Sequence, residues 1–370
     1  MKRTIGLAAA LLFVLVLAAA VSAQEQGEYS TYEGRVLAVE VLEPQPYADP
    51  SWENQLVTVR ILSGPHKGQV VQILHTLTGH PYFDLHVRSG QRVILQADES
   101  GPETQYYLAD LSRTRPLAVL TALFVLLVIV IGGPQGVKAI LSLAGMGVII
   151  FTLILPLILR GFNPIVVSVG LCSLLTVLFI LFVTGLTKKT AAAIAGTVGG
   201  LVAAGLLAWI VGRASSLTGL SSGEAQILQV LSANIDFQGV LFAGIIVGAL
   251  GAILDVGISI ASAMEQIKEA DPATDFLTLL TRGILVGRDM IATMSNTLIL
   301  AYVGSSLPLL LLFLASHTSW RQVLNLDLVA AEVVRAMAGS IGLTLAIPIT
   351  ALVAAFLFVQ PEHKGQHPRD

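Results

Sequence analysis

The sequence predicts a helical membrane protein with about seven membrane-spanning helices and a small N-terminal all-β domain of the OB-like barrel type. Three observations lead to this fold class. Only 12% of the 370 residues are charged, against about 25% in soluble domains. Apolar runs of about 20 residues, the length that crosses a bilayer, recur from Pro116 onward. Between residues 24 and 115, short apolar runs alternate with the period of β-strands instead.

Residues 1–23 have the pattern of a secretory signal peptide. Lys2 and Arg3 precede a long apolar run, and Val21-Ser22-Ala23 supplies the small residues of a cleavage site. The alternative is an uncleaved membrane anchor, because the apolar run is long for a signal peptide. Both interpretations export the residues that follow.

Residues 24–115 are expected to form an extracytoplasmic β domain. Five short runs rich in Val, Ile, Leu or Tyr are bounded by turn residues. They are Gly34–Leu42, Gln55–Leu62, Gln69–Leu77, Arg92–Ala97 and Gln105–Leu111. Five strands of this length suit a small OB-like barrel. OB barrels often bind nucleic acid, but this domain lacks a basic, aromatic-rich face and the chain has a net charge of -3. We therefore expect no nucleic-acid partner.

Metal binding is a weak possibility in the same domain. It contains His66, His75, His80 and His86, but no pair has a tight ligand spacing with a supporting carboxylate or thiol. The single cysteine, Cys172, excludes an intrachain disulfide and a four-cysteine metal site. No metal and no cofactor are expected.

The region 116–360 is expected to be the transmembrane domain, followed by a cytoplasmic tail at 361–370. Seven apolar runs each have the length of a span. They cover about 117–133, 138–159, 164–186, 191–212, 238–261, 290–314 and 339–359. Pro348 lies within the last span and predicts a kink there.

Loop charges favour an orientation with the β domain outside and the C-terminus inside. The predicted inner loops hold most of the lysines, including Lys138, Lys188, Lys189 and Lys268. A lysine and arginine excess marks the cytoplasmic side of membrane proteins. The bias is modest, but it agrees with the export signal.

Three further segments are expected to be amphipathic helices at the membrane surface. Ser221-Ser222-Gly223-Glu224 resembles a capping box before an apolar segment. Leu326–Met337 places its apolar residues along one side, on the outer surface. Asp275–Val286 follows a break at Asp271-Pro272 and is expected on the inner surface.

Small residues form stripes on the fourth and fifth spans. Such spacing lets helix backbones approach closely, which matters where lipid gives no hydrophobic push between helices. A packing role is favoured over a pore-lining role. The residues are Gly196 and Gly200 on one span, and Gly244, Gly248 and Gly251 on the next.

Two spans carry polar residues where lipid would oppose them. Asp255, Ser259, Ser262 and Gln266 share one face of a helix, because they are spaced by three or four residues. Asp289, Thr293, Asn296 and Thr297 share a face of the next span, and Arg288 is an ion-pair candidate. The two faces are expected to meet in a hydrogen-bonded network. Ionisable groups inside a bilayer mark functional sites by default.

Two interpretations of this constellation remain open. One is a site for a proton, a metal cation or a small polar solute. The other is a structural clamp between helices, for which a carboxylate is a costly choice. The sequence contains no Gly-x-Ser-x-Gly, His-Glu-x-x-His or phosphate-loop motif, and no histidine lies in a predicted span. An enzyme is therefore not expected.

The central motifs resemble those of the YibE/F family of bacterial multi-pass membrane proteins. The resemblance rests on segments in the β domain and in the two polar spans. They are Val57–Pro65 with Gly68, Asp255–Ala263, Gln266–Ala270, Gly287–Ile291, Thr293–Leu298 and Tyr302–Pro308. The resemblance covers most of the chain and implies the same architecture in a bacterial cytoplasmic membrane. It implies no particular activity.

The sequence thus favours a multi-pass membrane protein that moves or senses a small ion or solute through a site at Asp255 and Asn296. The alternative is a membrane scaffold that presents the β domain to an envelope partner without transport. The lipid bilayer is the expected environment, and a protein partner or a homo-oligomer is compatible with both functions.

Overall fold

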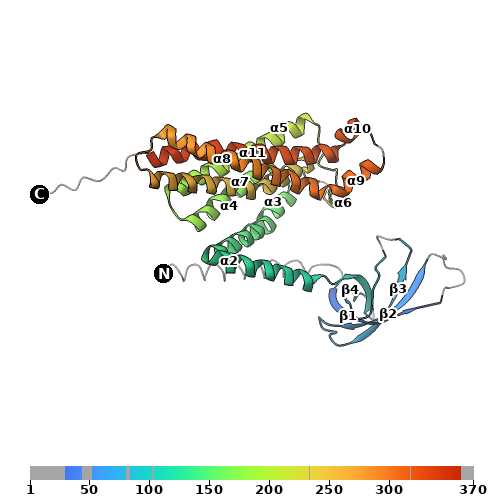
Figure 1. Ribbon diagram of the computed structural model, residues 1–370. Helices are drawn as coiled ribbons and strands as arrows, with labels where there is room; N and C mark the ends of the chain where they lie inside the picture. Colours follow the sequence, from blue (N-terminus) through green and yellow to red (C-terminus); the bar gives the residue numbers. More distant parts are fainter. Residues whose placement is uncertain are drawn as a thin grey trace. The chain divides into compact units, whose positions relative to one another are not determined.

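The computed structural model describes residues 30–43, 52–80, 84–101, 104–232, 234–316 and 318–359. The predicted signal segment 1–23 and the tail 361–370 lie outside these residues. The chain divides into two compact units, Met1–Ile140 and Leu141–Asp370 (Figure 1). Each is described by itself below.

The first unit contains the antiparallel β-sheet that the sequence predicted. Its strands pair in the order β3-β2-β1-β4-β5, and the two edge strands β3 and β5 approach one another. This half-barrel with five strands is the OB-like arrangement expected. The strands are β1 (Ser30–Val41), β2 (Glu53–Ile61), β3 (Val70–Leu77), β4 (Arg92–Asp98) and β5 (Gln105–Leu111).

Alternation along the strands builds the core of the half-barrel. Val57, Val59 and Ile61 of β2 are fully buried, because successive side chains of a strand point to opposite faces. Gly34 of β1 lies over this core, where a Cβ would be 2.5 Å from Val59 Cγ1. A glycine is therefore needed for the close approach of β1 to β2.

One ion pair fastens β1 to β4. Arg92 donates a hydrogen bond of 2.9 Å to the carboxylate of Glu33, and the hydroxyl of Ser112 donates a second of 3.1 Å. The guanidinium of Arg92 holds the pKa of the Glu33 carboxyl below its ordinary value. Glu33 thus links the first strand to the residue that follows β5.

The first long helix contains a break. Helix α2 (Thr114–Ile149) continues through the π-helical turn η1 (Ile150–Ile154) into α3 (Leu155–Leu159). Gly133 has φ 54° and ψ −135°, outside the helical region, and Pro134 follows it. The predicted spans 117–133 and 138–159 lie on either side of this break.

Six helical segments in the described residues are long and apolar enough to cross a membrane. One of them is the 46-residue segment Thr114–Leu159, which contains the first two predicted spans, one on either side of the break at Gly133. The helices of the second unit are α4 (Pro164–Thr184), α5 (Lys188–Ala214), α6 (Gly223–Leu231), α7 (Phe237–Ala270), α8 (Phe276–Ser305), α9 (Leu307–Ala315), α10 (Trp320–Leu324) and α11 (Asp327–Val359).

Two of the three predicted surface helices are parts of longer ones. Asp275–Val286 belongs to the start of α8, and Leu326–Met337 belongs to the start of α11. No helix-breaking residue separates either segment from its span, so the hydrogen-bond ladder continues. The third is a separate helix, α6, in which the Ser222 hydroxyl accepts a hydrogen bond from the N–H of Ala225 at 3.2 Å.

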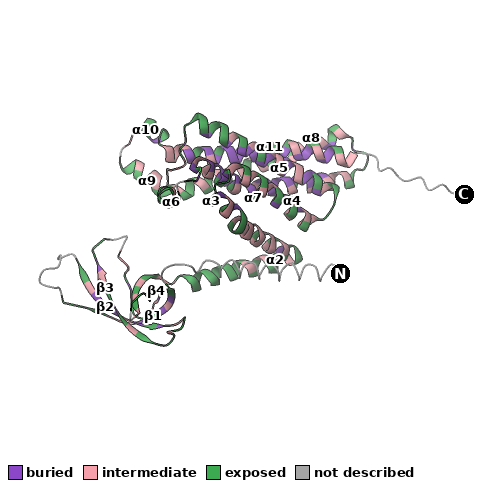
Figure 2. Cartoon of the chain, turned by 180° about the vertical axis from the view of Figure 1, so that it is seen from behind, coloured by how far each residue is buried: buried purple, intermediate pink, exposed green. Residues whose placement is uncertain are grey.

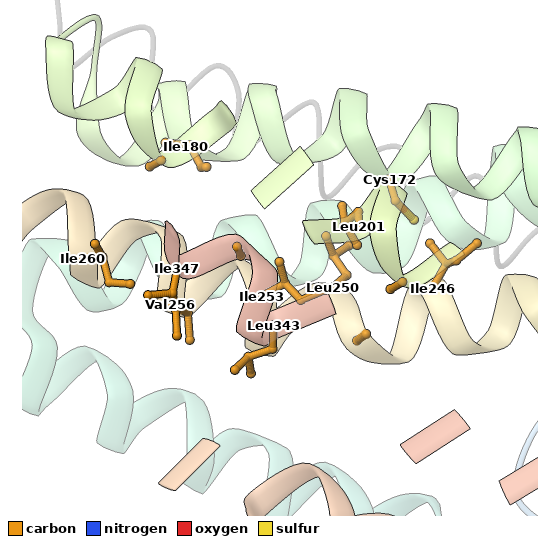
Figure 3. Close-up of a cluster of buried hydrophobic side chains, with 14 of the residues drawn as sticks. Cys172, Ile180, Leu201, Ile246, Leu250, Ile253, Val256, Ile260, Leu343 and Ile347 are labelled. Carbon is orange, nitrogen blue, oxygen red and sulfur yellow. The ribbon is translucent and has the colours of Figure 1, made fainter. Parts of the chain in front are cut away.

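The core of the second unit lies between α4, α5, α7 and α11. Helix α11 packs against α5, α7 and α8, and α7 packs against α4 and α5. Figure 3 shows side chains of this core, among them Ile253 of α7, Leu201 of α5 and Leu343 of α11, which are fully buried. Buried positions gather on α5, α7 and α11, whereas few residues of α8 are buried (Figure 2). Apolar helices of this length make the protein a membrane protein.

Candidate functional site in helices α7 and α8

Helix α7 combines a buried apolar face with an exposed face of small and polar residues. Asp236 caps its start by accepting a hydrogen bond of 2.9 Å from the N–H of Gly239. Lys268 binds the carbonyl oxygens of Pro272 and Thr274 at its end, each at 2.7 Å. The exposed face consists of Gly244, Gly248, Gly251, Asp255, Ser259 and Gln266, with Ser262 half-buried beside it.

Asp255 lies near the middle of the 34-residue helix α7 and is exposed. Among the described residues, no hydrogen bond or ion pair reaches its carboxyl group. Its helix neighbours Leu254 and Val256 are buried, so the carboxyl group points away from the core. A helix of this length is longer than the hydrocarbon core of a bilayer is thick. Because Asp255 lies near the middle of α7, it lies at the depth of the hydrocarbon core.

Helix α8 presents the second polar face, and that face is also exposed. The Thr297 hydroxyl donates to the carbonyl of Thr293 at 2.9 Å, and the Thr293 hydroxyl donates to Met290 O at 3.2 Å. Both threonines therefore use their hydroxyl protons within their own helix. Arg288, Asp289 and Asn296 are exposed as well.

Three contacts fix the antiparallel register of α7 and α8. A Cβ on Gly248 would lie 2.8 Å from Tyr302 Oη, one on Gly283 would lie 2.5 Å from Met264 Sδ, and one on Gly287 would lie 3.4 Å from Ile260 Cδ1. By interpolation between these pairs, Asp255 is level with Thr293. The polar residues of the two helices thus lie at the same depth.

The two polar faces do not meet in the predicted hydrogen-bonded network. In the described chain, Asp255 makes no hydrogen bond to Asn296, Thr293 or Thr297 and no ion pair with Arg288. The physical reason is that the glycines at 283 and 287 let α8 approach Met264 and Ile260 of α7 closely. Apolar contacts at these glycines therefore form the interface between α7 and α8, and the polar residues lie outside it.

Both polar faces lie on neighbouring helices of the second unit, at the same depth. Helix α11 packs against both helices, since Gly339 contacts Ala249 of α7 and Ile347 contacts Gly287 of α8. The polar residues lie on the exposed side of each helix, away from these contacts. We call this the polar surface; it comprises Gly244, Gly248, Gly251, Asp255, Ser259, Ser262, Arg288, Asp289, Thr293, Asn296 and Thr297.

The glycine stripes of α5 and α7 have different surroundings. A Cβ on Gly200 would lie 2.7 Å from the carbonyl oxygen of Gly342, and one on Gly196 would collide with the Thr350 side chain. The stripe of α5 therefore receives α11. In contrast, no atom outside the helix lies within 4 Å of a Cβ built on Gly244 or Gly251. The packing expected at these two positions has no partner inside the described chain.

Sequence reasoning did not assign an ion pair near one end of the polar surface. Arg335 of α11 donates to the Glu332 carboxylate at 2.8 Å, and both side chains are partly buried. Glu332 and Tyr302 line a cavity of about 180 Å³ between α8, α9 and α11. The available signal was the spacing of three residues between Glu332 and Arg335, which was interpreted as the polar side of a surface helix.

The histidines of the β domain do not gather around a common point in the described residues. Nε2 of His75 lies 2.9 Å from the carbonyl oxygen of Leu85. His66 packs edge-on against Tyr32 and Tyr106. No group of three or more His, Cys, Asp or Glu that could hold a metal occurs in the described part of the chain.

Comparison with known proteins identifies the same two regions. A family model described as YibE/F-like protein matches residues 120–360, and a model described as the YibE/F family N-terminal domain matches residues 29–111. No curated protein and no solved structure matches the chain.

Proposed function

The chain belongs to the YibE/F family, and from this premise we propose that it moves a small cation or polar solute across the membrane along its polar surface. The observation that carries the proposal is the exposed carboxyl group of Asp255, in the middle of an apolar helix and without a partner in the described chain. A charged group facing lipid is strongly disfavoured. A water-containing path beside Asp255 removes that cost.

The surroundings of Asp255 suit a path for a small hydrophilic species. Gly244 and Gly251 leave space along one side of it, and Ser259 and Ser262 supply hydroxyl groups along the other. Hard cations prefer oxygen ligands such as a carboxylate, and a carboxylate can also take up and release a proton. The class of substrate we favour is therefore a proton or a small cation.

Water access beside Asp255 is the experimental test of this path. In a Cys172→Ala background, Ser259→Cys should react with a small hydrophilic thiol reagent roughly tenfold faster than Leu206→Cys, because a thiol facing lipid ionises poorly. Leu206 is the matched control, since it is an exposed residue on the apolar outer face of α5. Equal, slow labelling at both positions would exclude a hydrated path and favour the scaffold alternative.

We further propose that the protein lies in the bacterial cytoplasmic membrane with its β domain outside. The lysine bias of the loops and the signal-like N-terminus support this orientation. In intact cells, an impermeant thiol reagent should label Ser100→Cys, whereas Ala273→Cys in the loop between α7 and α8 should react only after permeabilisation. Labelling of position 273 and protection of position 100 would reverse the orientation.

A further inference from the structure

We propose that a second copy of this chain covers the polar surface, in a two-fold dimer that places α7 of each protomer against α8 of its partner. The dimer rests on the proposed function, because it would enclose the path that the polar surface lines. The dimer also identifies what completes the path, namely the second copy of the chain. Each protomer would supply one wall, with Asp255 on α7 and Asn296 on α8.

The polar surface requires a cover. Asp255 is exposed at the depth of the hydrocarbon core, and Asn296 is exposed at a similar level on α8. Neither side chain has a hydrogen-bond partner among the described residues. Polar groups at this depth are found against protein or water and not against lipid tails. Within the described residues of the second unit, nothing covers them.

The glycine stripe of α7 is only partly filled within the described chain. On α5, Gly196 and Gly200 receive α11, and no space remains there for a side chain. On α7, Gly244 and Gly251 have no neighbour within 4 Å of a Cβ position. Stripes of this spacing allow a helix to approach closely in a membrane. The stripe of α5 already serves that purpose within this chain. On α7, Tyr302 of α8 lies beside Gly248, whereas the positions at Gly244 and Gly251 are open to a partner.

In such a dimer, the polar residues of the two protomers would complement one another. A two-fold axis along the membrane normal keeps each residue at its own depth and sets α7 antiparallel to the partner's α8. In this register, Asp255 is level with the partner's Thr293 and within one turn of the partner's Asn296. The Asn296 amide offers two N–H donors, and a carboxylate needs donors. The symmetric copy of this pair forms at the same time.

The same chemistry argues against the first half of helix α2 as the cover. Helix α2 is apolar from Leu117 to Gly132, and Thr121 is the single side chain with a donor in that stretch. It therefore offers Asp255 one hydroxyl at most. The partner's α8 offers an amide, and it adds the guanidinium of Arg288 about two turns away.

Cross-linking between two differently tagged copies tests the dimer in native membranes. One copy carries Gly251→Cys and the other carries Thr297→Cys, both in the Cys172→Ala background. Because the two cysteines are on different chains, only an intermolecular contact can join them. A short thiol cross-linker should give a product that carries both tags and has the summed mass of the two tagged protomers. The matched control replaces Gly251→Cys by Leu206→Cys on α5 and should give none.

A second variant should disrupt the dimer without disturbing the fold of the protomer. Gly244→Leu fills the free stripe and should abolish the cross-link, while thermal stability of the protomer stays unchanged because no atom of its own chain is near. Absence of the doubly tagged product, equal yield from Leu206→Cys, or a conjugate of different mass would overturn the dimer. Loss of transport in Asp255→Asn with no cross-link would reject the dimer alone. A cross-link together with a fully active Asp255→Asn would reject the transport path alone.

Discussion

Asp255→Asn is expected to abolish function while the protein remains folded and inserted in the membrane. Asn has nearly the same shape and still forms hydrogen bonds, but it can neither carry a charge nor release a proton. The measurement is complementation of a deletion phenotype, or flux of a proton or small cation into vesicles that contain the purified protein. We expect a loss of at least roughly tenfold, because a charged site that binds its substrate loses its main attraction.

The substitution Asp255→Asn distinguishes a transport site from a structural clamp. The worth of a clamp lies in its hydrogen bond, about 1 kcal/mol between membrane helices, and Asn preserves that bond. Protein level and thermal stability, measured in parallel, should match those of the unaltered chain. Asn296→Ala is the companion variant and should weaken activity, since it removes the amide level with the carboxyl group. Full activity of Asp255→Asn would instead support a scaffold that displays the β domain.

Gly200→Ala is expected to give the largest loss of stability for the smallest change of side chain. The added Cβ would lie 2.7 Å from the Gly342 carbonyl oxygen and 2.9 Å from Ala346 Cβ. Neither atom can move without shifting the backbone of α11. Overpacking of this kind costs about 1–3 kcal/mol, and thermal unfolding of the purified protein in detergent should occur at a clearly lower temperature. Gly200→Leu should reduce the amount of folded protein more strongly.

The matched control for this substitution is Gly170→Ala in α4. A Cβ there has no neighbour within 4 Å, and alanine favours the helix over glycine by up to about 1 kcal/mol. The thermal midpoint should therefore stay the same or rise slightly. If Gly200→Ala behaved like Gly170→Ala, the tight contact of α5 with α11 would not exist.

The sequence was sufficient for the elements whose pattern is local. The five strands were found within a few residues of their bounds, because alternation and turn residues such as Gly64 and Gly68 mark both ends. The apolar runs located all six long helices of the described chain. Their ends were less predictable: the starts of α8 and α11 are amphipathic, and the pattern alone does not show that the helix continues into the span.

The relation between the polar faces could not be obtained from periodicity. Helical spacing correctly grouped Asp255 with Ser259 and Asn296 with Thr293, since residues on one face repeat every three or four positions. Which faces meet is decided by side-chain volume at the contact. Helix α7 can approach α8 more closely at Gly283 and Gly287 than at the polar residues. This difference becomes visible only when the helices are packed in three dimensions. The same holds for Gly200 and Gly251, which have similar sequence surroundings and opposite environments.

The close contact between Gly200 of α5 and Gly342 of α11 has a consequence for biosynthesis. Helix α5 emerges from the ribosome well before α11, the helix that fills its glycine stripe. Until α11 inserts, α5 and α7 lack the neighbour that completes their core, and an incomplete bundle exposes surfaces prone to misassembly. A nascent chain that ends before α11 should therefore be a substrate for membrane quality-control proteases, even though every residue of the polar surface has already been synthesised.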